Sequence, residues 1–348
     1  MPIRGGAMGD VPAAAKVLVR DLLRMKRGET VLVYGDPGAD PSVVRATVNA
    51  VEARGGNPIE LWCRIQGPPG TEPPKAVAEA MRASDAVVEF ARTYLITTKA
   101  FQRALDAGAR YLCLTGMDAD MMIRCIGEVS LPALKRFGKA LARITARAEE
   151  AQVTTAEGTD LRFKFGRRPV ILDTGECVTP GRDSYLGGQI SWAALERTIE
   201  GSIVFDGTVW PPDELAPLKE PIRIELRRGR VSAIEGGEGA KVLARWIRHF
   251  RDARMFNVAH FCFGFNPGAG ITGRILEDER AFGAFVTGLG SQQESFRGGL
   301  TLAKSHIDGV TVRPTVIFGS TEVERDGSFV HPALEGLQED LLKSRPGL

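Results

Sequence analysis

The sequence has few of the residues that usually mark a protein's chemistry. Of 348 residues only four are histidine and five are cysteine. The cysteines lie far apart and form no Cys-x-x-Cys pair, which argues against a thiolate zinc site and a disulfide framework. The net charge is +2 without a long block of one sign, so nothing indicates binding to nucleic acid. No run approaches the about 18 apolar residues of a membrane span, and residues 1–10 lack a signal-peptide core. We therefore expect a protein of the cytoplasm.

The length is about twice that of a typical single domain and predicts two domains. Residues 1–148 alternate short apolar runs with helical patterns, as in a layered βαβ sheet. The predicted strands are 30–35, 59–63, 86–90 and 111–116, and residues 41–54 form a helix. This pattern predicts a Rossmann-like α/β domain. The turn after the first strand reads GDPGAD rather than GxGxxG, so no dinucleotide cofactor is expected.

Residues 149–348 show a different pattern, with several β-type segments and one clear helix, and this pattern predicts an α+β domain. A long helix at 131–149 is expected to bridge the two halves. Period-two alternation around an EGTD turn then predicts a hairpin. Further β-type segments are predicted at 202–209, 221–227 and 310–318, with one helix at 239–251.

The histidines are the first candidates for chemistry. His306 and Asp308 stand two residues apart, so in a strand they point to the same face about 6.6 Å apart. His260, just before an Asn-Pro-Gly turn that would fix a strand end, could complete a 2-His-1-carboxylate triad of the kind that holds Fe(II). The spacing of His306 and Asp308 by itself leaves a simpler alternative to a metal site open: a histidine that happens to lie beside an unrelated aspartate. His249 and His331 are expected to be structural.

Several short motifs in a fixed order carry a family resemblance. They are GECVTP (175–180), HFCFGFNPGAG (260–270), ILEDE (275–279), GLGSQ (288–292) and SHID (305–308), within residues 150–318. Together they resemble the metalloaminopeptidase family of the aminopeptidase T and S type. The resemblance implies a fold of that type with a metal site in the second domain. Glu176, Glu279, His306 and Asp308 match positions that bind a pair of divalent metals in that family.

Two positions depart from the peptidase pattern. His260 stands where the peptidases have a glutamate, and Val286 stands where they have a histidine. Losing a carboxylate and an imidazole together argues against a second dication. The altered pattern resembles the 2,5-dihydroxypyridine 5,6-dioxygenase branch of nicotinate degradation. That resemblance implies one Fe(II) per subunit held by His260, His306 and Asp308, an aromatic substrate opened by O2 to N-formylmaleamate, and a homo-oligomer.

Four further residues are assigned supporting roles. Glu176 is expected either to manage the proton of a ring hydroxyl or to brace a metal ligand. Arg182 could pair with an anionic substrate or simply with Asp183. Glu279 is expected to hold the ring N–H of a histidine ligand from outside the metal shell, and Ser291 is a pocket candidate.

Two other functions stay open at this point. One is a true metalloaminopeptidase with a different ligand set and two metals per subunit. The other is a Rossmann-like binding module without turnover and without a tight metal. Cys177 and Cys262 adjoin proposed site residues but are expected to pack, since a thiol near Fe(II) and O2 is liable to oxidation. The sequence does not select the aromatic ring.

Overall fold

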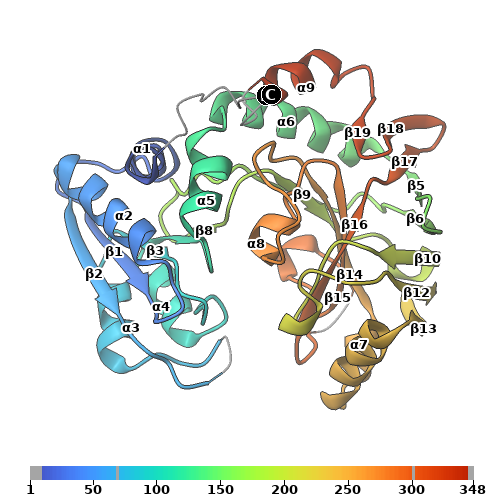
Figure 1. Ribbon diagram of the computed structural model, residues 1–348, viewed down its shortest axis with the longest axis horizontal. Coiled ribbons are helices and arrows are strands. Elements are labelled where there is room, and N and C mark those ends of the chain that lie inside the picture. The colour runs from blue at the N-terminus through green and yellow to red at the C-terminus, as the bar shows by residue number, and fades with distance from the viewer. Residues whose placement is uncertain (1–9, 68–69, 300–301, 344–348) are drawn as a thin grey trace, which may run out of the picture. The chain divides into compact units, whose positions relative to one another are not determined.

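The computed structural model describes residues 10–67, 70–299 and 302–343 (Figure 1). The described chain divides into two compact units. Unit 1 contains the described residues up to Leu131 together with Asp173–Gly187, and unit 2 contains Pro132–Leu172 together with Gly188–Lys343. None of the described helices is both long and apolar enough to cross a membrane.

Unit 1 is built on a parallel sheet with the strand order β2-β1-β3-β4-β8. Its strands are β1 (Thr30–Gly35), β2 (Asn57–Trp62), β3 (Ala86–Glu89), β4 (Arg110–Cys113) and β8 (Asp183–Ser184). Its helices are α1 (Val11–Val17), η1 (Leu18–Leu22), α2 (Pro41–Ala53), α3 (Lys75–Arg82), α4 (Lys99–Asp106), α5 (Ala119–Met122) and η2 (Ile123–Gly127). Strands β3 and β4 are buried along their whole length, as in parallel sheets covered on both faces. The four predicted strands and the predicted helix of this part are confirmed.

The start of α2 shows how local sequence fixes an element. The Asp40 carboxylate accepts a hydrogen bond from the backbone N–H of Ser42 at 2.8 Å and so caps the helix. Pro41 follows at the first helical position, where its fixed φ suits the helix and its missing N–H costs nothing. The apolar face of α2, which includes Val43 and Val51, is buried.

The single boundary expected at residue 148 differs from the division in the structure. Helix α6 (Leu131–Arg147) lies almost wholly in unit 2, where the Phe137 ring packs 5.5 Å from Phe265 and 5.1 Å from Phe329. Residues 173–187 return to unit 1, because β8 extends the parallel sheet beside β4. A single boundary along the sequence does not anticipate a chain whose described part crosses between the units three times.

Unit 2 contains two sheets. The eight-stranded sheet has the order β13-β12-β10-β6-β5-β17-β18-β19, and the six-stranded sheet has the order β11-β16-β15-β14-β9-β7. The first comprises β13 (Arg230–Gly236), β12 (Ile222–Arg227), β10 (Glu200–Phe205), β6 (Asp160–Lys164), β5 (Glu150–Thr154), β17 (Thr315–Phe318), β18 (Thr321–Arg325) and β19 (Ser328–Phe329). The second comprises β11 (Val209–Trp210), β16 (His306–Val312), β15 (Ala284–Gly290), β14 (Val258–Gly264), β9 (Gln189–Trp192) and β7 (Val170–Asp173).

The helices of unit 2 are few and mostly short. Besides α6 they are η3 (Glu196–Thr198), η4 (Asp213–Leu215), α7 (Glu238–His249), η5 (Ala253–Phe256), α8 (Ile275–Asp278), η6 (Glu294–Phe296) and α9 (Glu335–Leu342). The predicted hairpin is the β5–β6 pair, and α7 matches the predicted helix at 239–251. The β-type segment expected at 310–318 is divided between β16 and β17, which belong to different sheets.

An aromatic core joins the two sheets. Phe163 of β6 stacks on Phe261 of β14 with ring centroids 4.4 Å apart, and Phe318 of β17 lies 6.2 Å from Phe263 of β14. Because side chains alternate along a strand, the residues between these phenylalanines point to the opposite face of the six-stranded sheet. His260 lies on that opposite face.

Candidate metal centre

Three neighbouring strands bring the candidate ligands together. Strands β14, β15 and β16 pair antiparallel, and His260, Gly288 and Asp308 lie directly opposite one another across them. His306 lies two residues from Asp308 on β16, opposite Gly290. Residues opposite one another in a ladder, and residues two apart in a strand, share a face. The three candidate ligands therefore all project from one face of the sheet.

The three side chains meet at their donor atoms. His260 Nε2 lies 3.1 Å from His306 Nε2 and 3.4 Å from Asp308 Oδ1, and His306 Nε2 lies 3.1 Å from the same Oδ1. Adjacent ligands of a metal bound at about 2.1 Å lie about 3.0 Å apart, the bond length multiplied by √2. The observed separations fit three donors on one face of a single ion, which is the arrangement of a 2-His-1-carboxylate triad. Within the described ranges this is the only such group of three or more potential ligands.

The other ring nitrogens of the two histidines have partners that fix how the rings face. His306 Nδ1 lies 2.8 Å from the Ser291 carbonyl oxygen, and His260 Nδ1 lies 3.2 Å from Cys262 Sγ. A partner on one ring nitrogen sets the tautomer and leaves the other nitrogen to bind a metal. Both Nε2 atoms are thereby presented to the cluster.

The two histidines differ in charge. Burial lowers the pKa of His260 to about 4, although the Asp308 carboxylate partly opposes this effect. Burial also disfavours the charged form of His306, but the Asp308 carboxylate and the Ser291 carbonyl outweigh it and raise its pKa to about 9. The pKa of Asp308 is lowered: burial opposes this, and the neighbouring His306 more than compensates. At neutral pH the metal-free cluster holds a neutral imidazole beside an imidazolium–carboxylate pair.

Glu279 lies near this cluster and is held by two side chains. Gln189 Nε2 donates to its Oε2 at 2.7 Å, and Arg280 Nη1 lies 3.3 Å from its Oε1. Burial raises the pKa of Glu279 to about 7 against the attraction of Arg280, and the Asp308 charge adds to the rise. Glu279 was expected to hold the ring N–H of a histidine ligand. The Nδ1 atoms of His306 and His260 instead face the Ser291 carbonyl and Cys262 Sγ. Gln189 was not singled out from the sequence, where no motif marks it.

The acids before Glu279 have structural contacts. The carboxylate of Glu277 accepts from Gly270 N at 2.9 Å and from Thr272 Oγ1 at 3.1 Å. The carboxylate of Asp278 accepts from Thr272 N at 2.7 Å and from Gly273 N at 3.0 Å. These bonds tie the loop before α8 to the helix. The ILEDE motif therefore combines two loop-anchoring acids with one acid near the cluster.

Two candidate residues belong to unit 1. The Glu176 carboxylate is paired with Arg24 and accepts a hydrogen bond from Thr174 Oγ1 at 3.3 Å. Arg182 is exposed, and the Asp183 carboxylate accepts from the Tyr185 hydroxyl at 3.0 Å. The structure thus brings His260, His306, Asp308, Glu279 and Ser291 together in unit 2, whereas Glu176 and Arg182 lie in unit 1.

The two remaining histidines make local contacts. His249 Nδ1 lies 2.6 Å from the Trp246 carbonyl oxygen at the end of α7, and His331 Nδ1 accepts from Ala333 N at 3.1 Å. Val286 is fully buried in an apolar cluster with Cys262, Ala281, Ala284 and Val310. The position that carries a histidine in the peptidase pattern is thus filled by core packing.

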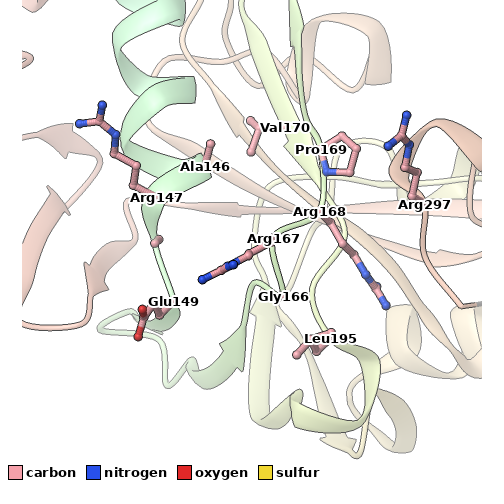
Figure 2. A pocket seen from close by; sticks show the side chains of 11 residues that line it. Ala146, Arg147, Glu149, Gly166, Arg167, Arg168, Pro169, Val170, Leu195 and Arg297 are labelled. Atoms are coloured by element: carbon pink, nitrogen blue, oxygen red, sulfur yellow. The ribbon is translucent and has the colours of Figure 1, made fainter.

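A hollow of about 950 Å³ in unit 2 is lined by none of these residues (Figure 2). Four arginines contribute to its wall: Arg147, Arg167, Arg168 and Arg297. Figure 2 shows their guanidinium groups pointing in different directions, and Arg168 is already paired with Glu196 at 2.6 Å. The arginines therefore do not converge on a single anion.

The fold and the cluster together define a class: a two-unit mixed α/β protein with a three-donor cluster on the face of a β-sheet. Residues 15–331 match the family model described as 2,5-dihydroxypyridine 5,6-dioxygenase, NicX. The chain belongs to this family. The 2,5-dihydroxypyridine 5,6-dioxygenase of Pseudomonas putida KT2440 is 25% identical over 321 residues, which cover 83% of this chain and 87% of the relative.

Two solved structures share the fold. The 2,5-dihydroxypyridine dioxygenase of Pseudomonas putida KT2440 superposes with a TM-score of 0.74 at 21% identity, covering 92% of this chain and 97% of that chain. Wild-type AmpT from Thermus thermophilus superposes with a TM-score of 0.66 at 14% identity, covering 92% and 98%. The expected likeness to the aminopeptidase T fold is confirmed.

Proposed function

We propose that this protein is a non-haem Fe(II) dioxygenase that opens the ring of a hydroxylated pyridine, converting 2,5-dihydroxypyridine to N-formylmaleamate in nicotinate degradation. The observation that carries the proposal is the convergence of His260, His306 and Asp308 within 3.4 Å of one another. Family membership supplies the reaction class. One iron per subunit is proposed. A homo-oligomer in the cytoplasm is proposed from the resemblance to the family.

The donor set suits this chemistry. Two imidazoles and one carboxylate leave up to three neighbouring positions, enough for O2 and for one or two donor atoms of the substrate. Bound Fe(II) supplies the route by which electrons pass from the ring to O2. The chain holds the ligands that orient the reactants. Ser291 and Cys262 fix the imidazole rings of His306 and His260, and the Asp308 carboxylate offsets one positive charge of the dication.

Glu279, Glu176 and Arg182 complete the proposal. Glu279, with a pKa of about 7, is suited to exchanging a proton near neutral pH. Glu176 is proposed as the acid/base that manages the proton of a ring hydroxyl, and its pairing with Arg24 agrees equally with a bracing role. Arg182 is proposed to pair with the anionic form of the substrate, which agrees with its exposure.

The experiment measures metal content and oxygen consumption on the same anaerobically purified protein. Wild type is expected to hold one iron per chain and to consume O2 when 2,5-dihydroxypyridine is added. His306→Ala is expected to lose the iron and the O2 uptake together. Glu176→Gln is expected to keep the iron and slow turnover about 10²-fold or more if it acts on a proton. A bracing role would instead lower thermal stability with turnover little changed.

Other outcomes separate the alternatives. Two bound dications with hydrolysis of aminoacyl anilides would identify a metalloaminopeptidase and overturn the proposal. Protein that takes up no metal would indicate a binding module. One iron with no oxygen uptake would keep the metal centre and reject this aromatic substrate.

A further inference from the structure

The middle strand of the candidate centre carries glycine where the ligands cross it. His260 on β14 and Asp308 on β16 are two strand spacings apart, which is about 9.6 Å between backbones. Their donor atoms nevertheless lie only 3.4 Å apart. Both side chains must therefore lean over β15, and the residue between them on β15 is Gly288.

The His260 ring occupies the space that a side chain at 288 would need. A Cβ placed on Gly288 would lie 2.5 Å from His260 Nε2, 2.7 Å from Cδ2 and 2.9 Å from Cε1. The glycines with left-handed φ do not include Gly288, so its backbone conformation suits any residue. Space, and not conformation, requires glycine here. Gly290 differs, because its φ is +90° and its Cβ would meet the Ser305 carbonyl oxygen.

The ring has little freedom to move elsewhere. The Phe296 ring lies 5.3 Å from it, the His306 ring stacks 4.9 Å away at 18°, and Cys262 Sγ lies 3.2 Å from Nδ1. Reaching an ordinary contact of about 3.4 Å with a new methyl group would move Nε2 by about 0.9 Å. Ligand sets have to be held within about 0.5 Å to function.

We propose that Gly288 is a positioning residue of the metal centre. Because Gly288 has no side chain, the His260 imidazole can lie directly over the backbone of β15, and its Nε2 reaches the ion shared with His306 and Asp308. The inference rests on the proposed metal site and requires no particular substrate. It goes beyond the ligand set by assigning a steric requirement to a residue with no donor atom.

The test compares Gly288→Ala with Thr287→Ala in metal-stripped protein titrated with Co(II), which reports binding through its visible absorption bands. Thr287 is the neighbouring residue on the opposite face of β15, is fully buried, and has an unbonded hydroxyl within the described residues. Gly288→Ala is expected to weaken Co(II) binding about 10- to 100-fold and to change the absorption bands. Thr287→Ala is expected to keep the wild-type affinity and spectrum, because it removes no contact of the cluster and no hydrogen bond among the described residues.

Wild-type affinity and spectrum in Gly288→Ala would overturn the proposal even if its melting temperature falls. If Gly288→Ala does not fold, the double variant Gly288→Ala/His260→Ala decides. Because the clash is with the His260 ring, the double variant should fold as well as His260→Ala alone. A double variant that also fails to fold would overturn the proposal. Wild type that binds Co(II) in this titration but, when loaded with Fe(II), does not consume O2 with 2,5-dihydroxypyridine would count against the proposed function and leave this inference standing.

Discussion

His260 and His306 have opposite protonation preferences although their Nε2 atoms are 3.1 Å apart. Burial decides for His260, whose pKa falls to about 4, and the Asp308 carboxylate decides for His306, whose pKa rises to about 9. A metal binds only the neutral form of an imidazole. His260 is therefore ready to bind at neutral pH, whereas His306 must first lose a proton.

Metal binding at pH 7 is accordingly expected to release about one proton, because His306 is charged in the metal-free protein below its pKa of about 9. The release should fall toward zero as the pH rises past 9. Calorimetric titration of the stripped protein with Co(II), in buffers of different ionisation enthalpy, measures the number of protons. Binding heats at pH 7 that do not depend on the buffer would contradict this assignment.

At the scale of elements, the segment around α8 shows how three adjacent acids divide their roles. Glu277 and Asp278 are fully buried and bond to the loop at 270–273, whereas the Glu279 side chain keeps 17% of its exposure and lies near the cluster. Asp278 also accepts from Thr208 Oγ1 at 2.5 Å, which ties α8 to the turn before β11. A charged group can be this deeply buried because its oxygens are occupied by donors.

Asp278→Ala is expected to destabilise the protein by about 3 kcal/mol, because it leaves the buried Thr208 hydroxyl and the part-buried amides of Thr272 and Gly273 without their acceptor. Urea unfolding of variant and wild type measures the difference. Glu339→Ala, at an exposed position of α9, serves as the control and should stay within about 0.5 kcal/mol. An equally small effect at Asp278 would mean that the loop does not depend on this anchor.

Strand β14 shows what an element's sequence conveys and what it misses. The alternation of Phe261, Phe263 and Phe265 is typical of a strand with one buried aromatic face. The strand ends at Gly264, just before the Asn-Pro-Gly turn that was expected to fix a strand end, and His260 is the third of its seven residues. The position matters because the ladder with β15 places His260 opposite Gly288, whereas the ladder with β9 begins only at Phe261.

At the scale of the whole molecule, unit 1 holds a carboxyl group in its interior. Glu89, at the end of β3, is fully buried, and burial raises its pKa to about 8. Its Oε1 accepts from Leu95 N at 2.9 Å, and its Oε2 has no hydrogen-bond partner within the described residues. Tyr34, Tyr111, Cys113 and Asp36 are the titratable groups that act on it. The neutral form is therefore favoured in the folded chain.

This burial predicts a pH dependence of stability. Glu89 ionises near pH 4.5 in the unfolded chain but only near pH 8 in the folded one, so its contribution is complete below pH 4.5 and is lost as the pH rises to 8. The stability of wild type relative to Glu89→Gln should therefore fall by up to about 4 kcal/mol between pH 5 and pH 8. Urea unfolding at several pH values measures the difference. Glu52→Gln, at an exposed position of α2, should run parallel to wild type, and the same behaviour in Glu89→Gln would refute the prediction.

Local sequence patterns determined much of the parallel sheet of unit 1, the β5–β6 hairpin and helix α7, because the periods of apolar residues depend only on near neighbours. The spacing of His306 and Asp308 likewise determined that they share a face of one strand. His260 was a candidate from its place before the Asn-Pro-Gly turn, and the match of motifs to a known family supported it.

Tertiary structure alone decided the rest. Strand register across β14, β15 and β16 placed His260 opposite Asp308, with Gly288 between them. Packing decided which acid of the ILEDE motif lies near the cluster, and sheet pairing returned residues 173–187 to unit 1. These outcomes depend on contacts between residues tens of positions apart, and no local period encodes such a distance.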